Sequence, residues 1–308
     1  MTQTVADKSV DVVILTYKPD RRLGDILEGL EGQSIPPGKI LLMNTGREHL
    51  DRIIKEDDRI MSYDNVEIHH LDKADFDHGG TRKKAAEYTD AAFLIYMTQD
   101  ALPAGSDLIE ELLRPFDEDE DIAVSYARQL PVRGASPIEI YNREFNYPDG
   151  DMKKTKADEG RLGIKTYFCS DVCACYDMKI YAKLGGHIEK TVFNEDMIYA
   201  HKAVSAGYGI YYASKAKVYH SHNYSPVQQY RRNIDLGRSQ AEHPEVFGAV
   251  SSEGEGKKLV KGCISYLLKN GYWYLIPEFV AQCAGRYLGY RKGKRAGATG
   301  AESVDGVR

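Results

Sequence analysis

The sequence contains no apolar run that could cross a bilayer. Its strand-like stretches VDVVILTY and AAFLIYM stop well short of the ~20 apolar residues that a transmembrane helix needs. The first residues, MTQTVADKSV, lack the basic and apolar pattern of a secretory signal. We therefore expect a cytoplasmic location.

The sequence also lacks an excess of basic over acidic residues and any disulfide-like spacing of its cysteines. The formal net charge is −5, whereas nucleic-acid-binding proteins usually carry a basic excess, so we expect no nucleic-acid partner. The five cysteines form an odd set, and Cys169, Cys173 and Cys175 share one segment. A zinc site there is one interpretation, and buried reduced thiols are the one we favour.

A glycine-rich phosphate loop is the third absence. The first apolar segment is followed by Thr16-Tyr17-Lys18-Pro19, so neither a dinucleotide-binding fingerprint nor a Walker motif is present. The same absence argues against a nucleotidyltransferase. Any phosphate bound near this segment needs a metal ion or arginines.

What the first half does contain is an alternation of two periodicities. Helical spacing of apolar residues in 23–30 and the helix-prone segment 80–89 separate short buried-strand patterns at 10–17, 39–46, 66–72 and 91–97. This rhythm predicts an α/β fold with a mainly parallel sheet flanked by helices. Ligands of such sheets bind beyond the carboxyl ends of the strands.

Four polar or aromatic residues follow these predicted strand ends, namely Tyr17, Asn44, Asp72 and Asp100. We expect their loops to meet in one cleft. For Asp100 alone, a turn or helix-capping acid before LPAGSDLIEELL is the competing interpretation.

The second half adds acids and histidines. In FNEDMIYAHKAVSAGYG, Asn194 is a predicted N-cap that places Glu195 and Asp196 in the first helical turn, where carboxylates also simply favour the helix dipole. A strand-like run then ends in His220 and His222, which share one strand face and suit metal coordination or acid–base chemistry.

The order of these motifs resembles glycosyltransferase family 2 with the GT-A fold, a Rossmann-like mixed sheet. The resemblance rests on NTG, DHGGTRKKA, YMTQDALP, SDVCACY and GGHIEKTVFNEDMIYAHKAVSAGYG, and it covers about residues 8–240. FDHGGTR, TQDA and HSHNYS look most like bacterial rhamnosyltransferases that build cell-surface polysaccharides. Two departures stand out: Thr98-Gln99-Asp100 replaces the frequent Asp-x-Asp, and Asn44 stands where an acid is common.

The resemblance implies a metal-dependent inverting sugar transfer. Asp100 then binds Mn²⁺ or Mg²⁺ with His220 or His222 as the second ligand, and the mixed carboxylate–imidazole set leans towards Mn²⁺. Asp196 becomes the general base, and Glu195 orients it or touches the acceptor.

The implied donor is the dTDP-sugar dTDP-rhamnose, and the implied acceptor is a lipid-linked glycan. Assigned to the donor side are Thr16, Tyr17, Asn44, Asp72, His78, Arg82, Gln99, Arg231 and Arg232. Arg82 is expected to reach the diphosphate or to be a solvated helix charge, and His78 to touch sugar or pack in its loop. Arg231 and Arg232 are a candidate lid over the phosphates. For Gln99 the sequence predicts a place on the donor side but no specific contact. A catalytically silent sugar-nucleotide-binding or scaffold protein is the alternative function.

The C-terminal region differs in composition. We expect a catalytic domain over 1–240, a helical region over 241–295 broken at Gly271 and Pro277, and a disordered tail over 296–308, with SSEGEGKK (251–258) as an exposed connection. One interpretation is a peripheral contact with the cytoplasmic face of the membrane, made by Tyr272, Trp273, Tyr274, Phe279, Arg286, Arg291, Lys292, Lys294 and Arg295. The alternative is a helical subdomain packed on the core or on a second subunit, which leaves a homodimer open.

Overall fold

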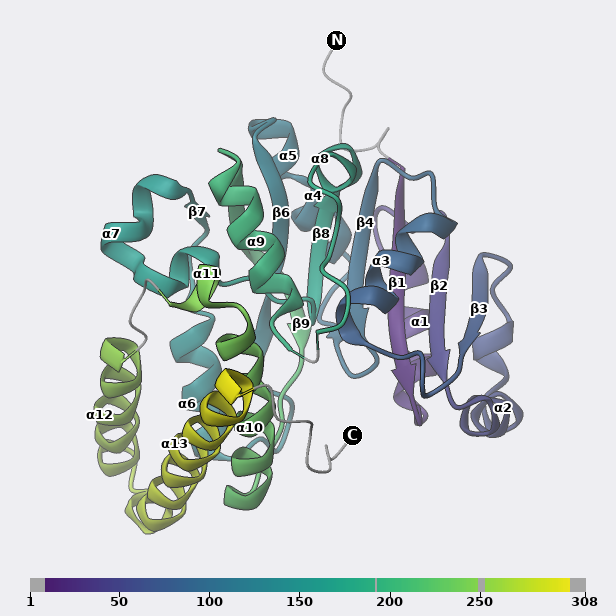
Figure 1. Cartoon of the computed structure of the whole chain (residues 1–308). Helices are drawn as coiled ribbons and strands as arrows, with labels where there is room; N and C mark the ends of the chain where they lie inside the picture. The colour runs from purple at the N-terminus through teal and green to yellow at the C-terminus, as the bar shows by residue number, and fades with distance from the viewer. Residues whose placement is uncertain (1–8, 192, 249–252, 300–308) are drawn as a thin grey trace.

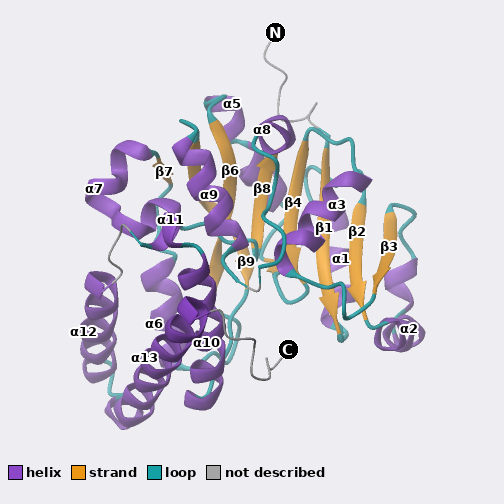
Figure 2. Cartoon of the chain, in the orientation of Figure 1, coloured by secondary structure: helices purple, strands orange, loops and turns teal. Residues whose placement is uncertain are grey.

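A computed structural model describes residues 9–191, 193–248 and 253–299, and its centre is a mixed β-sheet (Figures 1 and 2). The strand order is β3-β2-β1-β4-β8-β6-β9-β5, with β7 paired to β9. The strands are β1 Val10–Tyr17, β2 Ile40–Thr45, β3 Val66–Leu71, β4 Phe93–Thr98, β5 Leu102–Pro103, β6 Ile122–Leu130, β7 Met152–Lys154, β8 Cys173–Asp177 and β9 Gly209–Tyr219.

The four strands predicted in the first half are confirmed, and they pair in parallel. Beyond β4 the sheet changes character, because β8 runs antiparallel to both β4 and β6, while β6 and β9 are again parallel. In the segment that contains Cys169, Cys173 and Cys175, only Cys173–Asp177 is a strand, because the residues before it form a 3₁₀ turn and a loop. The fold is therefore mixed, with a fully parallel N-terminal half.

Helices cover both faces of this sheet. They are α1 Arg22–Glu31, α2 Arg47–Glu56, α3 His78–Ala85, α4 Leu108–Leu113, α5 Pro115–Glu118, α6 Pro137–Asn146, α7 Glu159–Leu162, α8 Met178–Lys183, α9 Glu195–Ser205, α10 Pro226–Glu242, α11 Pro244–Phe247, α12 Glu253–Lys269 and α13 Ile276–Thr299. Strand β1 shows why both faces are covered: Val12 and Ile14 enter one apolar core, whereas Val13 and Leu15 enter the other.

The start of α9 differs from the prediction. Asn194 does occupy the N-cap position, but its φ is 65° and its side chain makes no capping hydrogen bond. Its amide Nδ2 instead donates to Ser239 Oγ at 3.0 Å. Asn194 thus links the start of α9 to α10, and the short polar side chain tolerates the left-handed backbone.

The C-terminal helices pack on the catalytic domain, as the alternative interpretation predicted. Figure 1 shows α10, α12 and α13 gathered beside the end of the sheet at which β9 stops. The predicted boundary at 240 falls inside α10, and residues 253–258 are helical, which corrects their assignment as a connection. Helix α13 reaches Thr299, so residues 296–299 of the predicted disordered tail are helical; residues 300–308 lie outside the described part.

Only one of the two predicted helix breaks holds. Gly271 has a φ of 79° and separates α12 from α13, a backbone conformation that suits glycine. Pro277 instead lies in the first turn of α13, where a proline fits without loss of a hydrogen bond. Across the described residues, no helix combines the length and apolar character required to pass through a bilayer.

The aromatic and basic residues of this region divide between core and surface. Phe279 is fully buried beside Cys263 and Leu267, which corrects its predicted membrane position. Trp273 and Tyr274 remain 66% and 59% exposed. The subdomain therefore packs inward through one face and presents aromatic side chains on another.

Candidate active site

The structure brings Asp100, His220 and His222 together beyond the strand ends. His220 Nε2 lies 3.5 Å from Asp100 Oδ1, and His222 Nε2 lies 3.2 Å from Asp100 Oδ2. The two Nε2 atoms are 3.1 Å apart. Among the described residues, this is the one group in which three such ligand atoms converge within 4.8 Å.

Buried hydrogen bonds fix the orientation of His220. Its Nδ1–H donates to Gln129 Oε1 at 2.9 Å, so its Nε2 lone pair faces Asp100. The Gln129 amide is itself oriented, because its Nε2 donates to Tyr147 Oη at 2.6 Å and to Ser170 Oγ at 3.0 Å. Sequence reasoning missed Gln129, which lies in the unpredicted strand β6.

The electrostatics favour a charged Asp100 and a neutral His220. Burial raises the pKa of Asp100, but its hydrogen bond to His222 and the nearby His220 outweigh burial, and the net pKa is strongly lowered. Burial lowers the pKa of His220 to about 3. A carboxylate with two neutral imidazole nitrogens is a donor set that fits a divalent cation, and imidazole favours Mn²⁺ over Mg²⁺.

A cavity of about 380 Å³ opens beside this cluster. It is lined by both histidines and by Asp196, the predicted base, so the structure brings these three residues together. The cavity draws on β6, α6, the loop before β8, the start of α9, α10 and α13. Such a concave, partly polar space is typical of a substrate site.

Asp196 has a raised proton affinity. Burial and the charges of Glu195 and Asp171 raise the pKa of its carboxyl well above the usual value. Its Oδ1 accepts the Met197 N–H at 2.7 Å, and its Oδ2 accepts the Asp171 N–H at 3.3 Å. A carboxylate of this kind suits proton abstraction near neutral pH.

Arg82 lies in neither of its two expected environments. The side chain is 3% exposed, its Nε is 2.9 Å from Asp171 Oδ2, and its Nη1 is 2.9 Å from Glu195 Oε1. His187 Nε2 adds a further contact to Asp171 at 3.0 Å. Arg82 is thus neither solvated nor free to reach a diphosphate, and it anchors the segment that precedes Asp196.

Glu195 and His78 lie at the edge of the same network. Glu195 forms an ion pair with Arg82, and this contact restricts the rotation of its carboxylate beside Asp196. His78 Nδ1 is 4.0 Å from Glu195 Oε1, and its ring meets Phe76 edge-on at 5.1 Å. His78 is nearly half exposed, and burial of the rest of the ring lowers its pKa.

The predicted donor-side residues form two pairs and one isolated acid. Thr16 Oγ1 donates to Asn44 Oδ1 at 3.0 Å, and both side chains are buried. Gln99 Oε1 accepts the Tyr17 N–H at 2.9 Å, and Gln99 Nε2 donates to the Tyr17 carbonyl at 2.8 Å. Asp72 is exposed directly after β3.

The two arginines of the predicted lid separate. Arg232 lines the cavity, with its guanidinium over Phe193 at 4.8 Å and Tyr224 at 5.5 Å. Both arginines are exposed to solvent, but Arg231 does not line this cavity. The neighbouring positions therefore differ in their access to a ligand.

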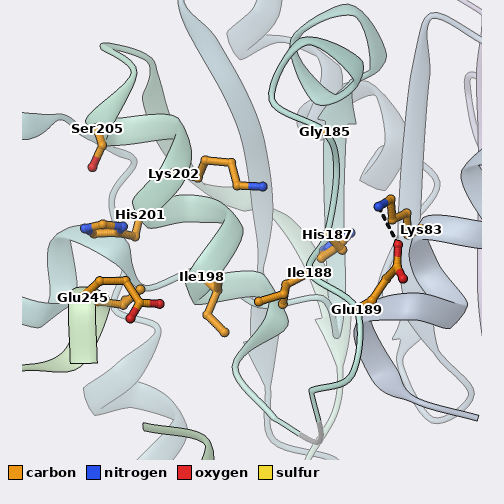
Figure 3. Close-up of a pocket in the computed structure, with 11 residues that line it drawn as sticks. Lys83, Gly185, His187, Ile188, Glu189, Ile198, His201, Lys202, Ser205 and Glu245 are labelled. Atoms are coloured by element: carbon orange, nitrogen blue, oxygen red, sulfur yellow. Dashed lines mark hydrogen bonds and ion pairs between the residues drawn. The ribbon is translucent and has the colours of Figure 1, made fainter. Parts of the chain in front are cut away.

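A second cavity, of about 520 Å³, lies elsewhere and contains neither the histidine cluster nor Asp196 (Figure 3). It is lined by one face of α9, including Ile198, His201 and Lys202, and by the loop around Ile188. Lys83 and Glu189 are ion-paired at its edge at 2.6 Å. The predicted chemistry therefore belongs to the smaller cavity.

The predicted reduced thiols are confirmed. All three are buried thiols, Cys169, Cys173 and Cys175. Burial raises the pKa of Cys169 and Cys173, so these thiols stay protonated and poor metal ligands at neutral pH. No zinc site forms from these cysteines within the described residues.

The mixed sheet and the helices on both of its faces define a GT-A-like fold. Two solved structures share this arrangement: the TarS 1–349 fragment from S. aureus, with a TM-score of 0.54 and 14% identity over 95% of this chain and 92% of that one; and the mannosyltransferase PcManGT from Pyrobaculum calidifontis, determined with GDP-Man and Mn²⁺, with a TM-score of 0.51 and 12% identity over 96% and 76%.

The chain belongs to glycosyl transferase family 2, whose model matches residues 11–185. Two curated relatives extend the match to nearly the whole chain. The O-antigen chain rhamnosyltransferase RfbN of Salmonella typhimurium strain LT2 is 37% identical over 92% of this chain and 89% of its own length. The O-antigen chain rhamnosyltransferase WbaN of Salmonella anatum is 35% identical over 93% and 89%.

Proposed function

We propose that this glycosyltransferase moves L-rhamnose from dTDP-rhamnose to a growing, lipid-linked cell-surface polysaccharide. The names of the two Salmonella relatives support the sugar and the polysaccharide, because they align with about nine tenths of the chain. One structural observation carries the reaction type: His220 and His222, which cluster with Asp100, line the same cavity as Asp196.

Asp100, His220 and His222 are the proposed ligands of a divalent cation, preferentially Mn²⁺. When bound, that cation neutralises the charge of the departing diphosphate. Both histidines belong to the ligand set, since their Nε2 atoms lie at similar distances from the two Asp100 oxygens. Gln129 keeps His220 in the tautomer that presents Nε2.

Asp196 is the proposed general base of a single inverting displacement. Its carboxylate takes the proton of the acceptor hydroxyl as that oxygen bonds to the anomeric carbon. The bond from that carbon to the diphosphate oxygen breaks on the opposite face, and the nucleoside diphosphate leaves with the electron pair. Glu195, held by Arg82, positions the first turn of α9, which carries the base.

A peripheral membrane contact is the second part of the proposal. Helices α12 and α13 and the 3₁₀ turn between them expose several large apolar side chains, Leu268, Trp273, Tyr274, Val280, Tyr287 and Leu288. Basic residues Arg291, Lys292 and Lys294 are exposed further along α13. Aromatic and basic side chains together suit the headgroup region of an anionic bilayer, where a lipid-linked acceptor lies.

A panel of sugar nucleotides tests the proposed function. The purified protein is incubated with each donor and a lipid-linked glycan acceptor, with Mn²⁺, Mg²⁺ or EDTA, and nucleoside diphosphate release is measured. We expect release with dTDP-rhamnose and a metal, and none with EDTA. Binding of sugar nucleotide without transfer or hydrolysis under any condition would instead favour the catalytically silent alternative.

A further inference from the structure

Helix α13 sends one charged side chain into the active-site cavity. Arg286 lines the same cavity as Asp196 and His222, although α13 follows the catalytic fold in the sequence. This position corrects the prediction that Arg286 faces lipid. The C-terminal subdomain therefore contributes to the wall of the transfer site.

Close backbone packing fixes where Arg286 emerges. A Cβ atom at Gly285 would lie 2.5 Å from the Pro226 carbonyl oxygen, and one at Gly289 would lie 2.1 Å from that of Tyr230. Only glycine permits this approach of α13 to α10. Because α10 also carries Arg232 into the cavity, the two guanidinium groups are delivered by two helices in tight contact.

Arg286 has no partner for its charge. Among the described residues, its guanidinium makes no hydrogen bond and no ion pair. Glu139 is the carboxylate whose charge acts on it, but Glu139 is paired with Arg143 at 2.7 Å and accepts the His222 N–H at 3.2 Å. Burial lowers the pKa of Arg286, and an arginine nevertheless stays charged. An unpaired charge at a partly buried position costs stability unless a ligand compensates it.

The cavity as a whole has an excess of unpaired positive charge. Arg232 lies over aromatic rings without a carboxylate partner in the described part of the chain, so it adds a second unpaired guanidinium. The remaining lining acid, Asp196, has a raised pKa. Guanidinium groups match phosphate oxygens in charge and in bidentate geometry.

We propose that Arg286, together with Arg232, binds the diphosphate group of a substrate in this cavity. The inference rests on the proposed function for the identity of the substrate, and two diphosphate sources fit it: the nucleotide donor and an isoprenoid diphosphate that carries the acceptor glycan. Arg286 is in either case a substrate-binding residue supplied by the C-terminal subdomain.

Direct binding tests the inference without relying on turnover. The full-length protein, Arg286→Gln, Arg286→Lys and the matched control Arg291→Gln are titrated with dTDP and with farnesyl diphosphate, each with Mn²⁺. Arg291 lies on the same helix but is exposed. We expect Arg286→Gln to weaken at least one probe about 10- to 100-fold, the effect of a lost charged hydrogen bond, and Arg291→Gln to change neither. Loss confined to dTDP identifies the donor, and loss confined to farnesyl diphosphate identifies the acceptor carrier.

A structural role is separated by thermal unfolding without ligand. Removal of an unpaired buried charge is expected to leave the Tm of Arg286→Gln unchanged or higher, and Arg286→Lys is expected to recover part of the affinity. Unchanged affinities in Arg286→Gln, or no binding of either probe by the wild type, overturn the inference. If the wild type binds diphosphate but transfers no sugar, the proposed function fails alone; if it transfers sugar and Arg286→Gln matches its KM and affinity, the inference fails alone.

Discussion

The guanidinium of Arg82 lies 2.9 Å from the carboxylate of Glu195, and both side chains are at least nine-tenths buried. This ion pair joins α3 to the first turn of α9, two elements separated by more than one hundred residues. It therefore holds the residue next to the proposed base from a distant part of the sequence.

Loss of Arg82 should destabilise the fold strongly. Arg82→Ala leaves Asp171 and Glu195 buried without a cation, a change that typically costs about 3 to 5 kcal/mol. The neighbouring pair Lys83–Glu189 is exposed, so Lys83→Ala should cost only about 0 to 1 kcal/mol. Urea unfolding of both variants checks the contrast, and equal losses would contradict the assigned role of Arg82.

The two histidines can be ranked as ligands by metal binding. We expect Asp100→Asn, His220→Ala and His222→Ala each to weaken Mn²⁺ affinity, measured by the EPR signal of free Mn²⁺ during titration. Loss of one of three ligands should weaken binding by an order of magnitude or more. His243→Ala is the control, because His243 pairs with Glu245 outside the cluster. A histidine variant with wild-type affinity would remove that residue from the ligand set.

Replacement of the proposed base should abolish transfer but preserve donor binding. Asp196→Asn is expected to lower kcat about 100- to 10,000-fold, the usual contribution of a general base, with dTDP affinity in the presence of Mn²⁺ little changed. The exposed acid variant Asp72→Asn provides a comparison on the donor side. Transfer at the wild-type rate by Asp196→Asn would exclude this residue as the base.

The raised pKa of Asp196 also predicts how stability depends on pH. In the folded state this carboxyl holds its proton at pH values at which the unfolded chain, with an ordinary pKa near 3.8, has lost it. The wild type thus loses stability as the pH rises from about 4 through the folded pKa, while wild-type activity rises as the base ionises. Asp196→Asn should gain Tm relative to the wild type over the same range. Parallel Tm curves would contradict the raised pKa.

The exposed aromatics predict a measurable membrane contact. Trp273→Ser with Tyr274→Ser should reduce co-flotation with liposomes that contain anionic lipid, because each exposed aromatic loses its place at the headgroups. Exposed Met61 and Val132, changed to serine on other parts of the surface, give the matched control. Point variants are preferable to deletion of the whole C-terminal region, because deletion would also remove Arg286 of α13 from the cavity. Unchanged flotation would contradict the membrane contact and leave the packed subdomain as the only remaining interpretation of this region.

Much of this fold is predictable from the periodicity of apolar residues and from turn-forming residues. The contacts within the candidate site are less predictable. Strands β1, β2 and β4 of the parallel half were predictable because both of their faces are buried, which leaves continuous apolar runs. Asp100, His220 and Asp196 were predictable because strand ends and helix starts are known locations for ligands. The contact of His220 with Asp100 and the cavity that His220 shares with Asp196 followed from topology and not from any single motif.

The roles that sequence reasoning missed depend on partners remote in sequence. Gln99 closes two hydrogen bonds with the Tyr17 backbone across β1 and β4, and nothing local to TQDA indicates them. Gln129 orients His220 from a strand that has no distinctive pattern. Arg286 looked like one more basic residue of a membrane-facing helix until the packing of α13 against α10 was known. Polar side chains are hard to assign from sequence because their roles depend on which buried partner they meet.

The glycine contacts of α13 make the choice between sugar transfer and donor hydrolysis sensitive to one methyl group. A Cβ at Gly289 would press on the Tyr230 carbonyl at 2.1 Å, and one at Gly293 would press on that of Ile234 at 2.0 Å. Either change pushes the helix outward and admits water beside an activated sugar. A protein altered at these positions keeps every predicted ligand and its base, yet it should spend donor on water instead of lengthening a glycan.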